Sequence, residues 1–169
     1  MPETKTYLGF KTITKAALNE QVMYMRLTNY TDYSLRVLIY LASQEPSKLS
    51  NIKEIAEVYG ISKNHLMKVT HDLGKMGVIE TIRGRNGGIK LAHPPNEINI
   101  GSIVRKTEDD FKVVECFDGG ACILTPICGL KHMLHKALSA YFDVLDGYTL
   151  ADIVQNPFMY RQLFDEGTK

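Results

Sequence analysis

The sequence predicts a mainly α-helical fold with a small β wing: a winged helix-turn-helix, a cysteine-bearing loop and a long dimerisation helix. Two short amphipathic segments that meet at Gly60 indicate the helix-turn-helix, and a glycine-rich hairpin signal at 83–88 indicates the wing. An apolar pattern of near-heptad spacing at 130–145 indicates the long helix. The expected divisions of the 169 residues are an extension at 1–24, the winged helix-turn-helix module at 25–95, the loop with the dimerisation helix at 96–154, and a tail at 155–169.

The bulk composition is that of a globular protein. An apolar content of 44% is enough to bury a core in one domain with an appended element. No apolar run approaches the roughly 20 residues needed to span a bilayer, and residues 1–24 lack the basic-then-apolar pattern of an export signal. We therefore expect a cytoplasmic protein without membrane contact, a compartment in which cysteines more often bind metal or react with oxidants than form disulfides.

Charge is unevenly distributed, although the net charge is only +1. Ser47–His93 holds eight Lys and Arg against four Asp and Glu, whereas Pro94–Leu130 holds three against six. A basic module is thus followed by an acidic segment that contains all three cysteines. This order indicates that the basic half binds a partner and that the acidic half senses a signal.

Helical spacing predicts a first amphipathic helix from Thr31 to about Glu45-Pro46. Its apolar positions are Leu35, Leu38, Ile39 and Ala42. Residues 1–24 have no comparable pattern, so Met25 is the expected start of the domain.

Two short helices are expected next. Asn51, with Glu54 three residues later, is typical of a capped helix start, and Ile52, Ile55 and Ala56 then face the core. Gly60 supplies the left-handed conformation that ends this helix, and Ser62 can cap the following one. The buried stripe of that second helix is expected to be Leu66, Val69, Leu73 and Met76.

The wing follows Gly77. The segments Val78–Ile82 and Ile89–Leu91 are rich in β-branched residues, and the run Arg-Gly-Arg-Asn-Gly-Gly at 83–88 between them favours a hairpin turn. A short helix is expected at Ile100–Thr107, followed by an irregular stretch that carries the cysteines.

The last predicted helix begins near Leu130 and ends at Gly147. Its apolar positions are Leu134, Ala137 or Leu138, Tyr141 and Leu145. This near-heptad spacing favours a dimer seam, with packing inside one chain as the alternative, because two or three heptads are compatible with both.

The helix-turn-helix carries side chains suited to double-stranded DNA. Such a motif needs a small residue where its helices cross, a turn residue that tolerates positive φ and an apolar anchor, and Ala56, Gly60 and Leu66 meet these needs. The first turns of the second helix enter a major groove, where Asn can pair with an adenine edge and Lys or Ser can contact phosphates or bases. The candidate contacts there are Ser62, Lys63, Asn64, His65 and Lys68. On the wing, Arg83 and Arg85 suit a minor groove or a phosphate track.

The three cysteines form a candidate metal site. Cys116, Cys122 and Cys128 are separated by five residues each, in a loop that also contains Gly119, Gly120, Pro126 and Gly129. A flexible loop can wrap thiolates, the soft ligands that iron prefers, around an iron-sulfur cluster. The spacing matches neither zinc-finger pairs nor ferredoxin runs, so three alternatives stay open: inert buried thiols, a thiol-disulfide sensor, and a zinc site completed by His132 or His135.

From Met25 to about Val154, the chain resembles the Rrf-type winged helix-turn-helix iron-sulfur transcriptional regulators, and within them the nitric-oxide-sensing repressors. The motifs that carry the resemblance are Met25–Arg36, Ile61–Leu66, Ile82–Gly88, Val104–Phe111 and the three cysteines. The resemblance implies a nitrosative-stress repressor that binds operator DNA as a homodimer and is released when its cluster is nitrosylated. It has no counterpart for residues 1–24.

The resemblance also implies one [4Fe-4S] cluster per subunit, with [2Fe-2S] as the alternative. The ligands would be the three cysteines and an aspartate from the first helix of the other subunit, which matches Asp32. From the residues alone, Asp32 is an N-terminal helix residue that suits the helix dipole and can pair with Arg36. A branch that regulates cluster biogenesis has a histidine three residues after the third cysteine. Here that position is Lys131, and His132 lies one residue further along the chain, which argues against this branch.

Three other functions remain open at this point. They are a regulator of iron-sulfur cluster biogenesis, a clusterless regulator that senses thiol oxidation or a metabolite, and a redox or cluster-carrier protein whose winged helix binds protein. An enzyme is not expected, because the sequence has no nucleotide-binding loop and no spacing typical of a nucleophile and its base.

Overall fold

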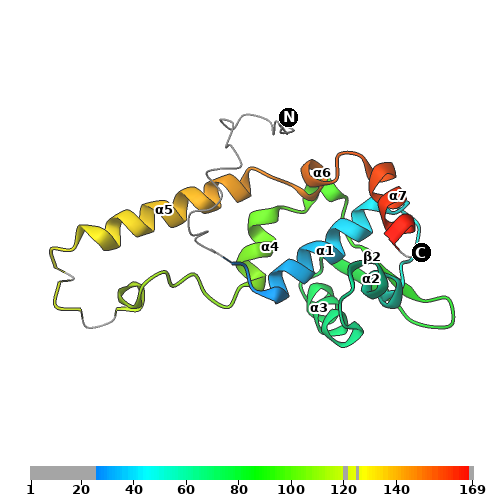
Figure 1. Cartoon of the computed structure of the whole chain (residues 1–169), viewed down its shortest axis with the longest axis horizontal. Coiled ribbons are helices and arrows are strands. Elements are labelled where there is room, and N and C mark those ends of the chain that lie inside the picture. The colour runs from blue at the N-terminus through cyan, green and yellow to red at the C-terminus, as the bar shows by residue number, and fades with distance from the viewer. Residues whose placement is uncertain (1–25, 120–121, 125, 168–169) are drawn as a thin grey trace, which may run out of the picture.

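A computed structural model describes residues 26–119, 122–124 and 126–167 (Figure 1). The expected extension at 1–24, Met25 and Gly120 lie outside these residues. The elements in chain order are α1 (Asn29–Ser43), α2 (Ile52–Tyr59), α3 (Lys63–Lys75), β1 (Ile79–Ile82), β2 (Gly88–Leu91), η2 (Pro95–Glu97), α4 (Ile100–Thr107), η3 (Glu115–Asp118), α5 (Gly129–Asp146), α6 (Leu150–Ile153) and α7 (Pro157–Gly167). The mainly helical fold with a β wing is confirmed, and no helix in the described ranges could cross a membrane.

Helix α1 is the centre of the core. Thr28 caps it, because its side chain accepts a hydrogen bond from the Thr31 amide at 3.2 Å. Its buried face includes the fully buried Val37 and Leu38 and meets α3, α4, α6 and α7. The helix ends at Ser43, where Gln44 becomes extended.

Helices α2 and α3 form the predicted helix-turn-helix. Asn51 and Glu54 make the expected capping box, and Gly60 ends α2 with a φ of 63°. Ser62 occupies the N-cap position of α3 but its side chain makes no capping hydrogen bond, so that expectation was wrong. Leu66 is fully buried and anchors α3 against the core.

The wing is an antiparallel pair in which Ile79 faces Leu91 and Ile82 faces Gly88. Ser50 extends it, because its backbone exchanges two 2.9 Å hydrogen bonds with Ile89. A β-carbon at Gly88 would lie 2.8 Å from the Ser50 carbonyl oxygen, so this close approach requires a glycine.

Helix α4 has the predicted bounds, and the cysteine segment after it is irregular except for the short 3₁₀ helix η3. Figure 1 shows α5 extending away from the domain, attached at its C-terminal end next to α4. Gly147 ends α5 with a φ of −73°, a right-handed conformation rather than the left-handed one common at helix ends.

The C-terminal segment packs on α1. Phe164 of α7 stacks on Tyr40 with ring centroids 5.2 Å apart, and Arg161 donates to the Ser43 carbonyl oxygen at 2.7 Å. Leu150 of α6 is fully buried. Part of the segment expected as a tail is therefore an ordered helix that covers the end of α1.

Candidate nucleic-acid interface and cysteine loop

The candidate DNA contacts at the start of α3 are all exposed, whereas Leu66 between them is fully buried. These exposed residues are Ser62, Lys63, Asn64, His65 and Lys68. The helical period turns Leu66 inward and leaves its neighbours on the outer face. The structure thus presents a polar and basic helix face that can enter a groove.

Two tyrosines of α1 contact this face. Tyr33 stacks on His65 with ring centroids 6.2 Å apart, and the ammonium group of Lys68 lies 5.8 Å from the centre of the Tyr30 ring. The Tyr30 hydroxyl donates to Asp72 at 2.9 Å. Burial, followed by the contact with this carboxylate, raises the pKa of Tyr30 to about 12, so the phenol stays protonated and keeps donating.

Tyr30 and Tyr33 were not among the residues expected at the site. They lie three residues apart on α1, on either side of Asp32, and this helical spacing was the available signal. Because Tyr30 and Tyr33 both contact α3, the turn of α1 that carries Asp32 packs against the helix predicted to enter the DNA groove.

The wing places Arg83 and Arg85 at the exposed end of the hairpin. Gly84 between them has a φ of 119°, which only glycine adopts readily, and Gly87 packs against the Ile82 carbonyl so closely that a β-carbon would clash. In Figure 1 the hairpin and α3 both lie below α1. The tip can therefore bring two guanidinium groups to nucleic acid alongside α3.

The cysteines are free thiols on the segment between α4 and α5. Cys116 lies in η3 and Cys128 at the N-cap of α5, both half-buried, while Cys122 is exposed. Within the described ranges of this single chain, no group of three or more His, Cys, Asp or Glu side chains is arranged to hold a metal. The Asp32 carboxylate forms an ion pair with Arg36 at 2.9 Å, the pairing that their four-residue spacing on a helix permits.

The chemistry of this segment fits an iron-sulfur cluster. It offers three uncommitted thiols, the ligands that such clusters take, on a backbone with little regular structure. Its apolar side chains are uncovered in the single chain, with Ile123 92% and Ile127 86% exposed. A loop of this kind has thiols to wrap around a group and apolar residues to shield it.

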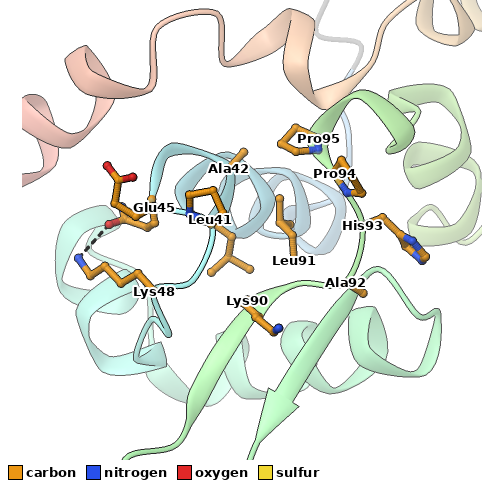
Figure 2. Close-up of a pocket in the computed structure, with 12 residues that line it drawn as sticks. Leu41, Ala42, Glu45, Lys48, Lys90, Leu91, Ala92, His93, Pro94 and Pro95 are labelled. Carbon is orange, nitrogen blue, oxygen red and sulfur yellow. Dashed lines mark hydrogen bonds between the residues drawn. The ribbon is translucent and has the colours of Figure 1, made fainter.

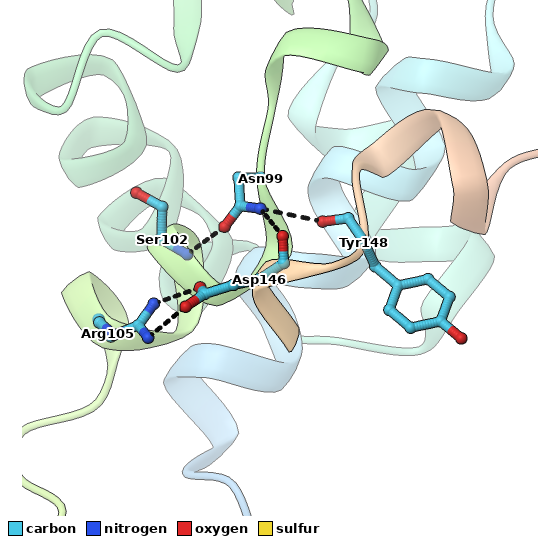
Figure 3. Close-up of polar contacts among 5 residues, drawn as sticks. All are labelled: Asn99, Ser102, Arg105, Asp146 and Tyr148. Carbon is cyan, nitrogen blue, oxygen red and sulfur yellow. Dashed lines mark hydrogen bonds and ion pairs between the residues drawn. The ribbon is translucent and has the colours of Figure 1, made fainter. Parts of the chain in front are cut away.

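Helix α5 is fastened to α4 at its C-terminal end (Figure 3). Arg105 forms a two-pronged ion pair with Asp146, and the Asn99 side chain donates to the backbone carbonyls of Asp146 at 2.8 Å and Tyr148 at 3.3 Å. The Arg105 guanidinium also lies 4.1 Å from the centre of the Phe142 ring. These contacts hold the base of the projecting helix.

A pocket of about 330 Å³ lies between the end of α1 and the stretch from β2 to Pro95 (Figure 2). Among the residues that the structure describes, no cysteine and no residue of α3 lines it. Leu41, Leu91 and Pro95 give it an apolar lining. Lys48 at its edge donates to Gln44 at 2.9 Å, so these two polar side chains satisfy each other.

Comparison with known proteins agrees with this geometry. The family model Rrf2, described as "Iron-dependent Transcriptional regulator", matches residues 27–156. The chain is 65% identical to "HTH-type transcriptional regulator NsrR" of Bacillus licheniformis, over 82% of this chain and 99% of that protein. It is also 65% identical to the protein of the same name in Bacillus subtilis, over 78% of this chain and 92% of that protein.

Solved structures of two regulators share the fold. The oxidised form of Staphylococcus aureus CymR superposes with a TM-score of 0.65 at 28% identity, over 78% of this chain and 98% of that one. The IscR of T. potens gives a TM-score of 0.65 at 27% identity, over 80% and 90% of the two chains. The predicted fold class is confirmed. The matching family and the two Bacillus relatives are described as transcriptional regulators, not as enzymes.

Proposed function

The chain belongs to the Rrf2 family of iron-dependent transcriptional regulators, and on this premise we propose that it is a nitric-oxide-responsive repressor. It binds operator DNA as a homodimer and leaves it when nitric oxide reacts with an iron-sulfur cluster. The observation that carries the proposal is the joint presence of an exposed α3 face and three free cysteines in a chain 65% identical to regulators named NsrR.

Operator binding is assigned to the α3 face and the wing. Asn64 and His65 would read base edges, while Lys68 and the wing residues Arg83 and Arg85 would contact the phosphate backbone. The remaining contacts, Ser62 and Lys63, lie at the helix start, where a phosphate is favoured. A two-fold dimer would bind an inverted repeat.

The dimer is assigned to α5. This helix has no fully buried residue, and Leu130 and Met133 are 53% and 57% exposed on its projecting half. A second copy of the chain would cover these side chains, as the near-heptad spacing favours. Leu134→Glu should then produce a monomer in analytical ultracentrifugation, whereas Lys136→Glu, at an exposed position, should leave a dimer.

The cluster, [4Fe-4S] with [2Fe-2S] as the alternative, would be held by Cys116, Cys122 and Cys128, with Asp32 of the partner subunit as the fourth ligand. When bound, it would supply iron with one hard and displaceable carboxylate ligand, open to nitric oxide. Once displaced from the iron, the Asp32 carboxylate would still form its ion pair with Arg36. A shift of this α1 turn reaches α3 through Tyr30 and Tyr33.

The proposal is tested by an anaerobic gel shift of the iron-loaded protein on an inverted-repeat duplex that the protein selects from a random pool. Nitric oxide should abolish the complex, and unchanged binding would refute the sensing role. An iron and sulfide assay with an absorption spectrum must accompany it, because a colourless, iron-free anaerobic preparation would favour the clusterless regulator.

The role of Asp32 needs a matched pair of variants. Asp32→Ala removes both the ion pair and the candidate ligand, whereas Arg36→Ala removes only the ion pair. We expect the absorption spectrum or lability of the cluster to change in Asp32→Ala alone. An identical cluster in both variants would rule out ligation by Asp32.

A further inference from the structure

Phe117 and His135 stack face to face between the cysteine segment and α5. Their ring centroids lie 4.1 Å apart and their planes differ by 5°. Phe117 directly follows Cys116 in η3, and His135 lies in α5, seven residues after Cys128. Neither residue has a part in the proposed ligand set or in the DNA contacts.

Helix geometry makes this contact informative about the cysteines. Seven residues correspond to about two turns of an α-helix, so His135 lies on nearly the same side of α5 as Cys128. The stack with Phe117 therefore holds the η3 segment on the side of α5 at whose start Cys128 stands, about 10 Å further along the helix axis. The Phe117 amide also donates to the Val114 carbonyl at 3.0 Å, which keeps Cys116 within a closed turn.

The stack also divides a long connection. Residues 108–128 link α4 to α5, and apart from η3 their described part has no regular secondary structure. A contact at position 117 converts this connection into two shorter loops, each with fewer conformations to lose when the thiols are gathered. Part of the entropy cost of ordering the cysteine segment is therefore met before any ligand binds.

We propose that Phe117 and His135 are positioning residues: their stack clamps the Cys116 segment onto α5, so that Cys116 is held on the same side of this helix as Cys128 before a cluster binds. The presence of a cluster rests on the proposed function, whereas the clamp, the stack of Phe117 on His135, is a contact within this chain that needs no cluster. His135 acts through the face of its ring and not through its nitrogens, so another flat ring can replace it.

Four variants separate these roles. Phe117→Ala and His135→Ala break the stack, and His135→Phe keeps it while removing both ring nitrogens. His132→Ala is the matched control, because His132 lies four residues after Cys128 on the same side of α5 and is likewise exposed.

The first measurement is amide hydrogen exchange of residues 115–119 in the metal-free full chain. In Phe117→Ala and His135→Ala, exchange should be roughly threefold to tenfold faster than in wild type, as expected from the strength of aromatic pairs. His135→Phe and His132→Ala should match wild type. Unchanged exchange in Phe117→Ala would overturn the clamp.

The second measurement is the rate of iron loss to a chelator from anaerobically reconstituted protein. Iron should leave faster by a similar factor in the two stack-breaking variants, and at the wild-type rate in His135→Phe. If His135→Phe loses iron as fast as His135→Ala, the nitrogens matter and the positioning role is wrong. A wild-type chain that takes up no iron or sulfide refutes the proposed function and the clamp's role in it, whereas a loaded wild type with unaltered variants refutes the clamp alone.

Discussion

Arg105 of α4 and Asp146 at the end of α5 form a fork-to-fork ion pair, with Nη1–Oδ1 and Nη2–Oδ2 distances of 2.5 and 2.6 Å. The two residues are 41 positions apart in the chain, and their carboxylate and guanidinium planes meet at the base of the projecting helix (Figure 3). The orientation of α5 relative to the DNA-binding module therefore depends on this pair. In a dimer built on α5, the Arg105–Asp146 pair would also influence the distance between the two copies of α3.

Changes at Arg105 should weaken operator binding through this geometry. Arg105→Lys keeps the charge but loses the planar fork, and Arg105→Ala also removes the cation from the face of the Phe142 ring. We expect operator affinity to fall in the order wild type, Lys variant, Ala variant in a fluorescence-anisotropy titration. Lys106→Ala, next to it on α4, controls for the loss of a positive charge, and an equal effect there would contradict the role of the fork.

The same pair predicts a dependence of stability on pH. Hydrogen bonds from Arg105 hold the pKa of Asp146 below its ordinary value of 3.8. A carboxyl group with a lowered folded-state pKa stabilises the fold above 3.8, and this contribution is lost as the pH falls through the folded value. In urea unfolding, Asp146→Asn should be less stable than wild type at neutral pH, and the difference should shrink below pH 3.8. A constant difference would show that the charge of Asp146 is not responsible.

A side chain at Gly101 should disturb the ion pair at the base of α5. A β-carbon there would overlap the Asp146 carboxylate, which must move and loosen its pair with Arg105. Because the overlapping atoms are the ends of two flexible and partly exposed side chains, the cost is only that of the weakened ion pair, which is small at a surface. In urea unfolding, Gly101→Ala should therefore gain less stability than a glycine-to-alanine change at an open helix position. Gly74→Ala in α3 is the control, since nothing lies within 4 Å of its β-carbon. It should stabilise by roughly 0.5–1 kcal/mol through helix propensity.

Loss of the Tyr30 hydroxyl should affect DNA binding more than loss of the Tyr33 hydroxyl. Tyr30→Phe keeps the ring beside Lys68 but removes the hydrogen bond to Asp72, so α1 and α3 are less firmly joined. Tyr33→Phe keeps the ring that stacks on His65. A lower operator affinity in Tyr30→Phe than in Tyr33→Phe is expected, and the reverse order would contradict coupling through Asp72.

Substitutions on the α3 face and on the wing should affect specificity and salt dependence differently. Asn64→Ala should cost about 1–3 kcal/mol on the operator and little on unrelated DNA, because a base edge is read there. Arg85→Ala should weaken binding to both duplexes. It should also reduce the slope of log affinity against log salt by about 0.9, because one phosphate is no longer neutralised by the protein. Equal losses on both duplexes for Asn64→Ala would reassign this residue to the backbone.

Much of the fold was predictable because its signals are local. The capping box of Asn51 and Glu54 spans three residues, and the left-handed turn at Gly60 depends on that residue alone. The bounds of α4 and the wing also followed from short patterns. Local reasoning failed at Ser62, whose side chain was expected to cap α3 and does not. The residue type allows a cap, but the orientation of the hydroxyl depends on its surroundings.

The helices α1 to α5, the wing, the exposed face of α3 and the set of three cysteines were all predictable from the sequence, because helical period, turn chemistry and residue type act over a few positions. Helix α7, in the segment expected as a tail, was not. Which distant groups meet depends on how the helices pack. The pairs Arg105 with Asp146, Phe117 with His135, and Tyr30 with Asp72 join different elements, and nothing in their spacing marks them as partners. Such contacts form when whole helices pack, since the apolar core sets the relative placement of helices and the polar and aromatic groups at their edges then find each other.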